Sequence, residues 1–155
     1  MKFTSEELDD LIKHHDFNWM PKADLSGANL NGVDLSECVL YNSDLSKANL
    51  SGAILVRATL SGIDLTDANL SDAILYKADL SGANLNGACL KNANLHYTIM
   101  FGAKLISSDL SGASLVGADL TYTDLLYTNL CEAKYDNNTK WPDGFDPVRA
   151  GAILT

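Results

Sequence analysis

The chain has 155 residues, carries a net charge of −9 and contains three cysteines. One repeat array fills most of this length, which predicts a single domain, and the acidic balance argues against direct nucleic-acid binding, because nucleic acids bind basic surfaces. No apolar run is long enough for a signal peptide or a membrane span, and three cysteines give no disulfide framework, so we expect a cytoplasmic protein with free thiols and no membrane contact, a removed targeting segment being the alternative.

The segment 1–21 predicts a helix that covers one end of the molecule. Residues 4–7 form a capping-box sequence at its start. Apolar residues follow at helical spacing, and two aromatic residues add bulk after them: Leu8, Leu11, Ile12, Phe17 and Trp19. We interpret the segment as an N-terminal capping helix for the array that follows; a partner-binding helix is the alternative.

The segment 22–133 carries a five-residue repeat. Leucine or methionine occupies every multiple of five from Leu25 to Leu130, which makes 22 consecutive registers with Met100 as the one exception to leucine. Ala stands two positions before this central residue in 14 registers, and Asp or Asn stands one position before it in 14. The two residues after the centre are mostly small, polar or charged, so the consensus is Ala-Asp/Asn-Leu-Ser-Gly.

This pattern predicts a coiled β-solenoid. The central residue and the small residue two before it share one face of a strand, and a bend must absorb the remaining residue of each pentad. The polar residues after the centre, often Ser-Gly or Asn-Gly, supply that bend, because Gly and Asn tolerate turn conformations. An α-helix is disfavoured, since a period of five sweeps the leucines around its surface. Residues 53–58 resemble residues 73–78, which indicates coils of 20 residues, or four pentads.

The repeat resembles that of the pentapeptide-repeat proteins, most clearly at residues 23–30, which read Ala-Asp-Leu-Ser-Gly-Ala-Asn-Leu. The resemblance covers residues 22–133. It implies an all-β fold, a right-handed quadrilateral parallel β-helix of about 5.5 coils with an N-terminal helical cap. It also implies a non-enzymatic protein-interaction scaffold, although the repeats do not identify the partner.

The segment 134–155 is interpreted as a C-terminal capping tail. The five-residue periodicity of central residues continues to Tyr135 and then ends. Residues 139–152 are similar to a tail common in cyanobacterial-type members of the family. A Pro-Asp-Gly turn signal lies between Trp141 and Phe145, which can cover the last coil. An end-to-end homodimer contact is the alternative use of this end.

The repeats contain no recognisable chemistry. We find no Ser/His/Asp set, no Cys/His metal spacing and no Gly-rich phosphate loop, so we expect no catalytic residue, no cofactor and no metal. The many Asp residues belong to the consensus, and each is expected to make a local hydrogen bond in its turn.

Sorting the pentads onto four faces reveals an acidic stripe, defined by Asp24, Asp44 and Asp64, which stack at strand spacing. Some members of the family resemble duplex DNA in this way and bind DNA gyrase. A DNA-mimic regulator of such an enzyme is therefore the alternative function. Because Lys47 and Lys104 interrupt the stripe, we favour ordinary solvated repeat residues.

A second departure from the consensus is apolar and spans two neighbouring faces. The apolar patch is defined by side chains that stand where the consensus has polar or small residues: Ile54, Val56, Ile74, Tyr76, Tyr97, Ile99 and Phe101. A contiguous apolar area usually marks a contact with a partner or a second copy of the chain. β-Branched and aromatic ladders also favour a sheet surface by themselves. The patch is our candidate binding site for an unknown protein partner.

Overall fold

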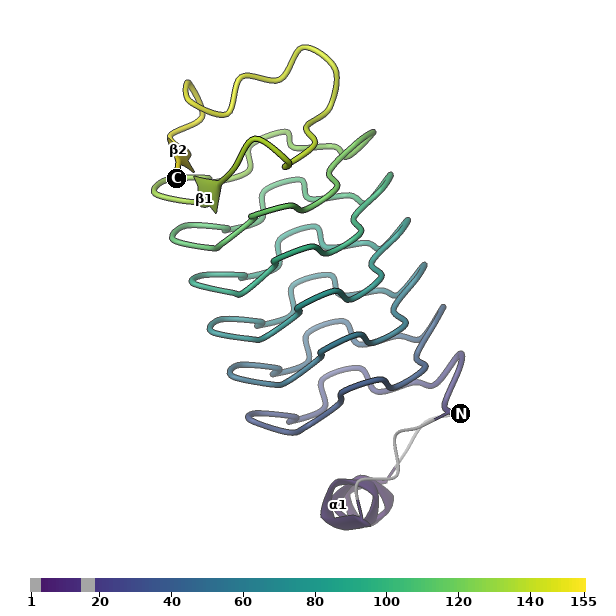
Figure 1. Ribbon diagram of the computed structural model, residues 1–155. Coiled ribbons are helices and arrows are strands. Elements are labelled where there is room, and N and C mark those ends of the chain that lie inside the picture. The colour runs from purple at the N-terminus through teal and green to yellow at the C-terminus, as the bar shows by residue number, and fades with distance from the viewer. Residues whose placement is uncertain (1–3, 15–18) are drawn as a thin grey trace.

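The computed structural model describes residues 4–14 and 19–155. Figure 1 shows a rod of stacked coils, with helix α1 (Ser5–His14) at the first coil and the C-terminal tail over the last. In the described part of the chain, two segments are long enough to be named strands. These are β1 (Lys134–Tyr135) and β2 (Ile153–Leu154), which pair in parallel.

Parallel backbone bridges join residues that lie 20 apart along the whole rod. The offset is constant from the bridge between Asp24 and Asp44 to the bridge between Ser114 and Lys134. The same hydrogen bonds recur in each rung, as where the Leu75 N–H donates to the Asn94 carbonyl at 2.8 Å. One turn of the rod therefore contains four pentads, as the likeness between residues 53–58 and 73–78 predicted.

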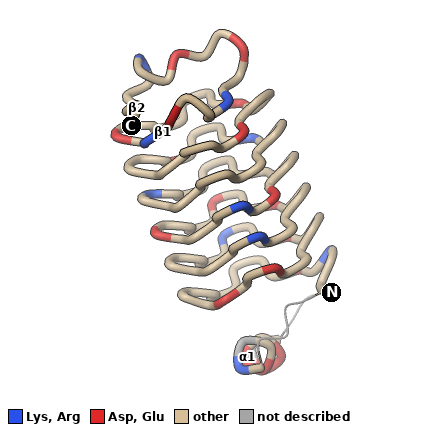
Figure 2. Tube along the Cα trace, in the orientation of Figure 1, with Lys and Arg blue, Asp and Glu red and all other residues tan. Residues whose placement is uncertain are grey.

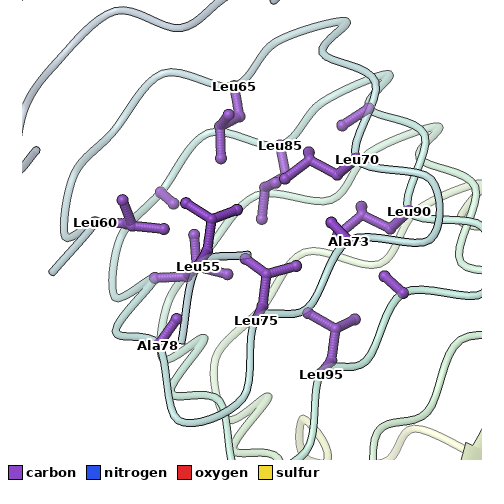
Figure 3. Close-up of a cluster of buried hydrophobic side chains, with 14 of the residues drawn as sticks. Leu55, Leu60, Leu65, Leu70, Ala73, Leu75, Ala78, Leu85, Leu90 and Leu95 are labelled. Atoms are coloured by element: carbon purple, nitrogen blue, oxygen red, sulfur yellow. The ribbon is translucent and has the colours of Figure 1, made fainter. Parts of the chain in front are cut away.

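The central and small residues of the pentads fill the interior. Of the 22 central residues all are buried except Leu125, and the alanines two positions before them are buried with them. Figure 3 shows leucines of successive coils, such as Leu55, Leu75 and Leu95, pointing inward above one another. This burial confirms the predicted inward assignment. The physical reason is that a spacing of two places both side chains on the same face of an extended segment.

Some pentads carry a hydroxyl residue inside the rod in place of alanine. The Thr98 Oγ1 donates to the Leu95 carbonyl at 2.8 Å, and the Ser108 Oγ donates to the Leu105 carbonyl at 2.7 Å. A buried hydroxyl is costly only when it lacks a partner. Each turn offers such a carbonyl, so small polar residues are tolerated in the interior.

Each pentad ends in a turn with a left-handed residue. From Lys22 to Glu132 every fifth residue has φ between 54° and 69°, and from Ala28 on the next N–H donates to the carbonyl of the preceding centre. This is the pattern of a type II turn, which favours Gly at that position. Gly fills 9 of these 23 positions, and most of the others hold the polar residues that the sequence indicated for the bend. Charged and aromatic residues also adopt it, because the ladders on either side hold the backbone in place.

Helix α1 begins with the predicted capping box. The Thr4 N–H donates to Glu7 Oε2 at 2.8 Å, and the Glu7 N–H donates to Thr4 Oγ1 at 3.2 Å. Leu8 and Leu11 are half-buried and pack against the core. Trp19 is 69% exposed and meets Tyr41 edge-on, so this ring covers little of the first coil. The Phe17 prediction lies outside the described residues.

The tail continues the ladders instead of leaving them. Lys140 bridges Asp119 at an offset of 21, and the Thr139 Oγ1 donates to the Leu115 carbonyl at 2.9 Å. The break after Tyr135 is therefore a one-residue insertion, after which the coil resumes. Trp141 stacks on Phe145 with ring centroids 5.2 Å apart, and both rings pack against the core, as the sequence indicated.

Replacing a fully buried central leucine should remove much of the stability. The Leu75→Ala variant leaves a cavity, so we expect its free energy of unfolding to fall by about 2–5 kcal/mol. Leu126, which is 54% exposed, is the matched control. Its change to alanine should stay within about 0.5 kcal/mol in urea titrations followed by circular dichroism. Equal losses in the two variants would contradict the inward assignment.

The attachment of the tail should depend on pH through Asp136. Its Oδ1 accepts hydrogen bonds from the Gly117 N–H at 2.8 Å and from the Asn138 N–H at 3.2 Å. The Gly117 bond, more than any other cause, lowers the pKa of Asp136 from 3.8 to about 2. Because the pKa of Asp136 is lower in the folded state, the ionised carboxylate stabilises the fold. This stabilisation is complete at a pH above the pKa of Asp in the unfolded chain, and it is lost as the pH falls through about 2. The stability difference between wild type and Asp136→Asn should therefore shrink between pH 5 and pH 2, and a constant difference would refute this assignment.

Candidate functional site

The apolar patch lies on two neighbouring faces and on the corner between them. Ile54 bridges Ile74 on the first face, and Ile99 stands in the ladder of the second face between Asp79 and Asp119. Four members are 37–50% exposed: Ile74, Tyr97, Ile99 and Phe101. The other three members, Ile54, Val56 and Tyr76, are half-buried. The most accessible part of the patch is therefore the corner formed by residues 97–101.

Aromatic rings connect the parts of the patch. Tyr76 meets Tyr97 edge-on with centroids 5.9 Å apart, and Phe101 meets Tyr122 with centroids 5.1 Å apart. A Cβ atom at Gly117 would clash with the ring of Tyr97, so this glycine lets the ring lie against the turn of the next coil. These contacts fix the orientation of the exposed rings.

Three strongly exposed apolar residues were missed by the sequence analysis. Tyr122, Leu126 and Tyr127 are 74%, 54% and 79% exposed, all in the last repeats. A signal was present in the pentad pattern, because both tyrosines occupy the left-handed turn position where the consensus has Gly. Tyr122 extends the patch through its contact with Phe101, whereas Leu126 stands on the next face.

Charged residues lie beside the patch at two places. The Lys77 Nζ lies 5.2 Å from the centroid of the Tyr76 ring, and Lys140 forms an ion pair with Asp119 at 3.0 Å. Burial raises the pKa of Asp119, but hydrogen bonds from Thr121 and Lys140 together outweigh burial, so that its pKa lies below the ordinary value. The patch thus has an apolar centre and an ionised rim, which is the usual anatomy of a protein interface.

The acidic stripe forms a ladder in which each carboxylate also serves its own turn. Oδ1 of Asp24, Asp44 and Asp64 accepts a hydrogen bond from the N–H two residues further, at 3.2, 2.9 and 2.9 Å. The same bond recurs at Asn positions, for example from the Ser51 N–H to Asn49. The predicted turn hydrogen bonds are confirmed at these positions. Figure 2 shows acidic and basic residues interspersed along the coils.

The described residues offer little for chemistry. They contain no group of three His, Cys, Asp or Glu side chains placed to hold a metal ion, and no described helix is long and apolar enough to cross a membrane. The three cysteines are free, as expected. Cys38 is buried, and burial raises the pKa of its thiol to about 12, whereas Cys131 is exposed.

A family model described as pentapeptide repeats, in eight copies, matches residues 23–62, 63–100 and 98–134. The chain belongs to the pentapeptide repeat family, whose known structures are right-handed quadrilateral β-helices. The ladders with an offset of 20 agree with four pentads in each coil of such a helix. A search of curated proteins finds no match.

Three of the solved structures similar to this chain come from cyanobacteria. The chain is 29% identical to the pentapeptide repeat protein alr5209 from Nostoc PCC 7120, over 100% of this chain and 98% of that one, with a TM-score of 0.51. It is 29% identical to Rfr23 from Cyanothece 51142, over 88% and 98%, also with a TM-score of 0.51. HetL, a protein involved in heterocyst differentiation regulation in Nostoc sp. strain PCC 7120, is 32% identical over 97% and 70%, with a TM-score of 0.47.

The stabilisation that the acidic stripe provides through its turn hydrogen bonds can be tested separately from the effect of its negative charge. Asp64 Oδ1 accepts from both the N–H and the hydroxyl of Thr66. Asp64→Ala should lower the free energy of unfolding by about 0.5–1.5 kcal/mol, because it removes the acceptor. Asp64→Asn keeps the acceptor and should cost clearly less. If thermal and urea denaturation show equal losses for both variants, the charge and not the turn bond is the stabilising element.

Proposed function

We propose that this protein is a non-enzymatic scaffold that binds another protein through the apolar patch. The observation that carries the proposal is the exposure of Ile74, Tyr97, Ile99 and Phe101 on a rod whose other outward positions are mostly polar. Contiguous exposed apolar area is uncommon on isolated soluble proteins and is typical of interaction sites. Membership of a family of repeat proteins that are generally not enzymes supports the same function.

The chemistry of the patch favours a protein partner over a small ligand. Aromatic side chains supply much of the energy of protein interfaces, and here Tyr76, Tyr97 and Phe101 lie in one area. The patch lies exposed on the outside of the coils, whereas small molecules bind in concave pockets. The rigid ladders beneath it keep the side chains in place before binding, which lowers the entropic cost of association.

We propose in addition that the segments at the two ends act as caps for the repeat domain at 22–133. The half-buried Leu8 and Leu11 of α1 support this role at one end, and the stacked Trp141 and Phe145 support it at the other. Covering the ends of a solenoid keeps its core and its backbone edges from pairing with other chains. A cytoplasmic location agrees with three free cysteines, because a reducing compartment keeps thiols unpaired.

The alternative function, a DNA mimic that regulates an enzyme such as DNA gyrase, has the acidic stripe in its favour. The ladder of Asp24, Asp44 and Asp64 ends at Asn84, and the next rung holds Lys104. This interruption leaves the stripe only three rungs long. Inhibition of gyrase supercoiling by micromolar protein, lost on changing Asp44 and Asp64 to Asn, would establish the mimic in place of the scaffold; no inhibition would dismiss it.

Charge placed on the exposed corner should abolish the association. We expect Tyr97→Asp with Phe101→Asp to reduce capture of a partner from a lysate of the source organism by tenfold or more, because aromatic anchors dominate such interfaces. If the partner is a second copy, the same variant should be monomeric in sedimentation, as should Ile54→Asp with Ile74→Asp. Asn29→Asp with Asn31→Asp adds the same charge to another face and serves as the control.

These variants should keep the circular-dichroism spectrum and melting temperature of the wild type, because the changed side chains point outward. Capture of the same proteins by wild type and the Tyr97/Phe101 variant, together with a monomeric wild type, would refute the patch as an interface.

A further inference from the structure

The last coil carries an unpaired backbone edge on the face that contains residues 123–127. One coil below, the Leu105 N–H donates to the Asp124 carbonyl at 2.9 Å and the Ser107 N–H donates to the Leu126 carbonyl at 3.0 Å. The equivalent donors one coil further are the N–H groups of Leu125 and Tyr127. Neither has a hydrogen-bond acceptor among the described residues, and the Thr123 carbonyl likewise has no donor there. An edge of this kind is a template for an added strand.

The tail adds a rung to the face before this one and to the face opposite, but none to this one. The Leu120 N–H donates to the Lys140 carbonyl at 2.7 Å, and the Ile153 N–H donates to the Ala133 carbonyl at 2.8 Å, so each of these faces gains a rung from the tail. Between them the tail stands away from the edge. It leaves a groove of about 370 Å³ between the last coil and the loop that follows Trp141, lined by Thr123, Asp124, Leu125, Leu126, Pro142, Asp143, Gly144 and Phe145.

The groove combines apolar and acidic side chains. Leu126 is 54% exposed, Leu125 is the one central residue of the array that is not fully buried, and the Phe145 ring stands across from them. Asp124 and Asp143 are both exposed at the rim. A ligand that fits must therefore bring backbone groups for the edge, an apolar side chain for the groove and positive charge for the rim.

A second copy of this edge does not meet these needs. Two edges could pair in antiparallel fashion about residue 124, with each Leu125 N–H donating to the Thr123 carbonyl of the other copy. That pairing would set the two Asp124 carboxylates directly opposite each other, and like charges at opposite positions destabilise a strand pair. A basic residue opposite Asp124 would instead form a favourable pair.

We propose that this groove binds an extended segment of a partner protein by strand addition. The segment hydrogen-bonds to the Leu125 N–H, the Tyr127 N–H and the Thr123 carbonyl, presents Lys or Arg to Asp124, and places an apolar side chain against Leu126 and Phe145. Backbone bonds give such strand addition its affinity, and side-chain pockets give it specificity. The site lies apart from the apolar patch and goes beyond the scaffold function proposed for that patch.

A random heptapeptide library displayed on phage is the probe that tests the proposal. Panning against the full chain should enrich peptides that combine Lys or Arg with β-branched or other apolar residues. Panning against Asp124→Lys should instead enrich Asp or Glu, while Asp64→Lys, a charge reversal in the same ladder away from the edge, should select the same peptides as wild type. Circular dichroism of both variants should confirm that they fold.

The strongest wild-type peptide then reports on the edge itself. In its presence the amide hydrogens of Leu125 and Tyr127 should exchange with solvent at least tenfold more slowly, because each gains a hydrogen bond. The same peptide with N-methyl groups at alternate residues should lose binding by tenfold or more, and the Tyr97/Phe101 double variant should bind the unmethylated peptide as wild type does.

Three outcomes would overturn the proposal. One is that no peptide is enriched above background. Another is that the peptides selected by wild type and by Asp124→Lys carry the same charge, or that binding leaves the two amides unchanged. The last is a concentration-dependent dimer in which these amides are already protected, which would assign the edge to a second copy of the chain.

Discussion

The backbone hydrogen bond between residues 20 apart is the constraint on which the whole molecule depends. Each pentad must be extended where it bonds to the coil below and the coil above, and it must turn before the next pentad begins. Two residues per pentad can then point inward, and the residue two after the centre, the third residue of the turn, must be left-handed. Buried leucine, the Asp or Asn turn bond and the small inner residue all follow from this one requirement.

The same constraint leaves the outward positions free to vary. Tyr97, Tyr122 and Lys77 occupy turn positions and adopt the same φ as glycine does there. They do so because the hydrogen-bonded ladders on both sides of the turn hold the backbone in this conformation whatever the side chain. The surface can therefore carry a patch of rings and aliphatic groups without disturbing the coil. For the same reason the acidity of the repeats is largely a property of their turns, where one carboxylate oxygen is engaged by the backbone.

The backbone ladders end at the first and the last coil, and a different kind of segment covers each of these two ends. At the first coil an amphipathic helix places leucines against the core. At the last coil the chain itself returns, and its one-residue insertion near Asp136 shifts the tail so that Lys140 still finds a rung on Asp119. Between the rungs that the tail supplies, residues 123–127 keep a free edge. The functional surfaces proposed for this protein are thus exceptions to a regular frame, one in side chains and one in backbone pairing.

The five-residue period by itself determined which side chains are buried, because that follows from local geometry repeated without interruption. The offset of 20 came from the sequence as well, through the likeness of residues 53–58 to residues 73–78. The capping box at Thr4 and Glu7 and the turn bonds of the Asp residues were equally predictable, since they involve neighbours in sequence. Only the tertiary structure decided that Trp19 stays exposed, that the break after Tyr135 is an insertion, and that Tyr122, Leu126 and Tyr127 stand so far in solvent. The pentad pattern determines whether a side chain points inward or outward. How exposed a side chain of the last coil is, and whether its backbone is paired, depend on whether another segment covers that coil. The path of the C-terminal tail decides this.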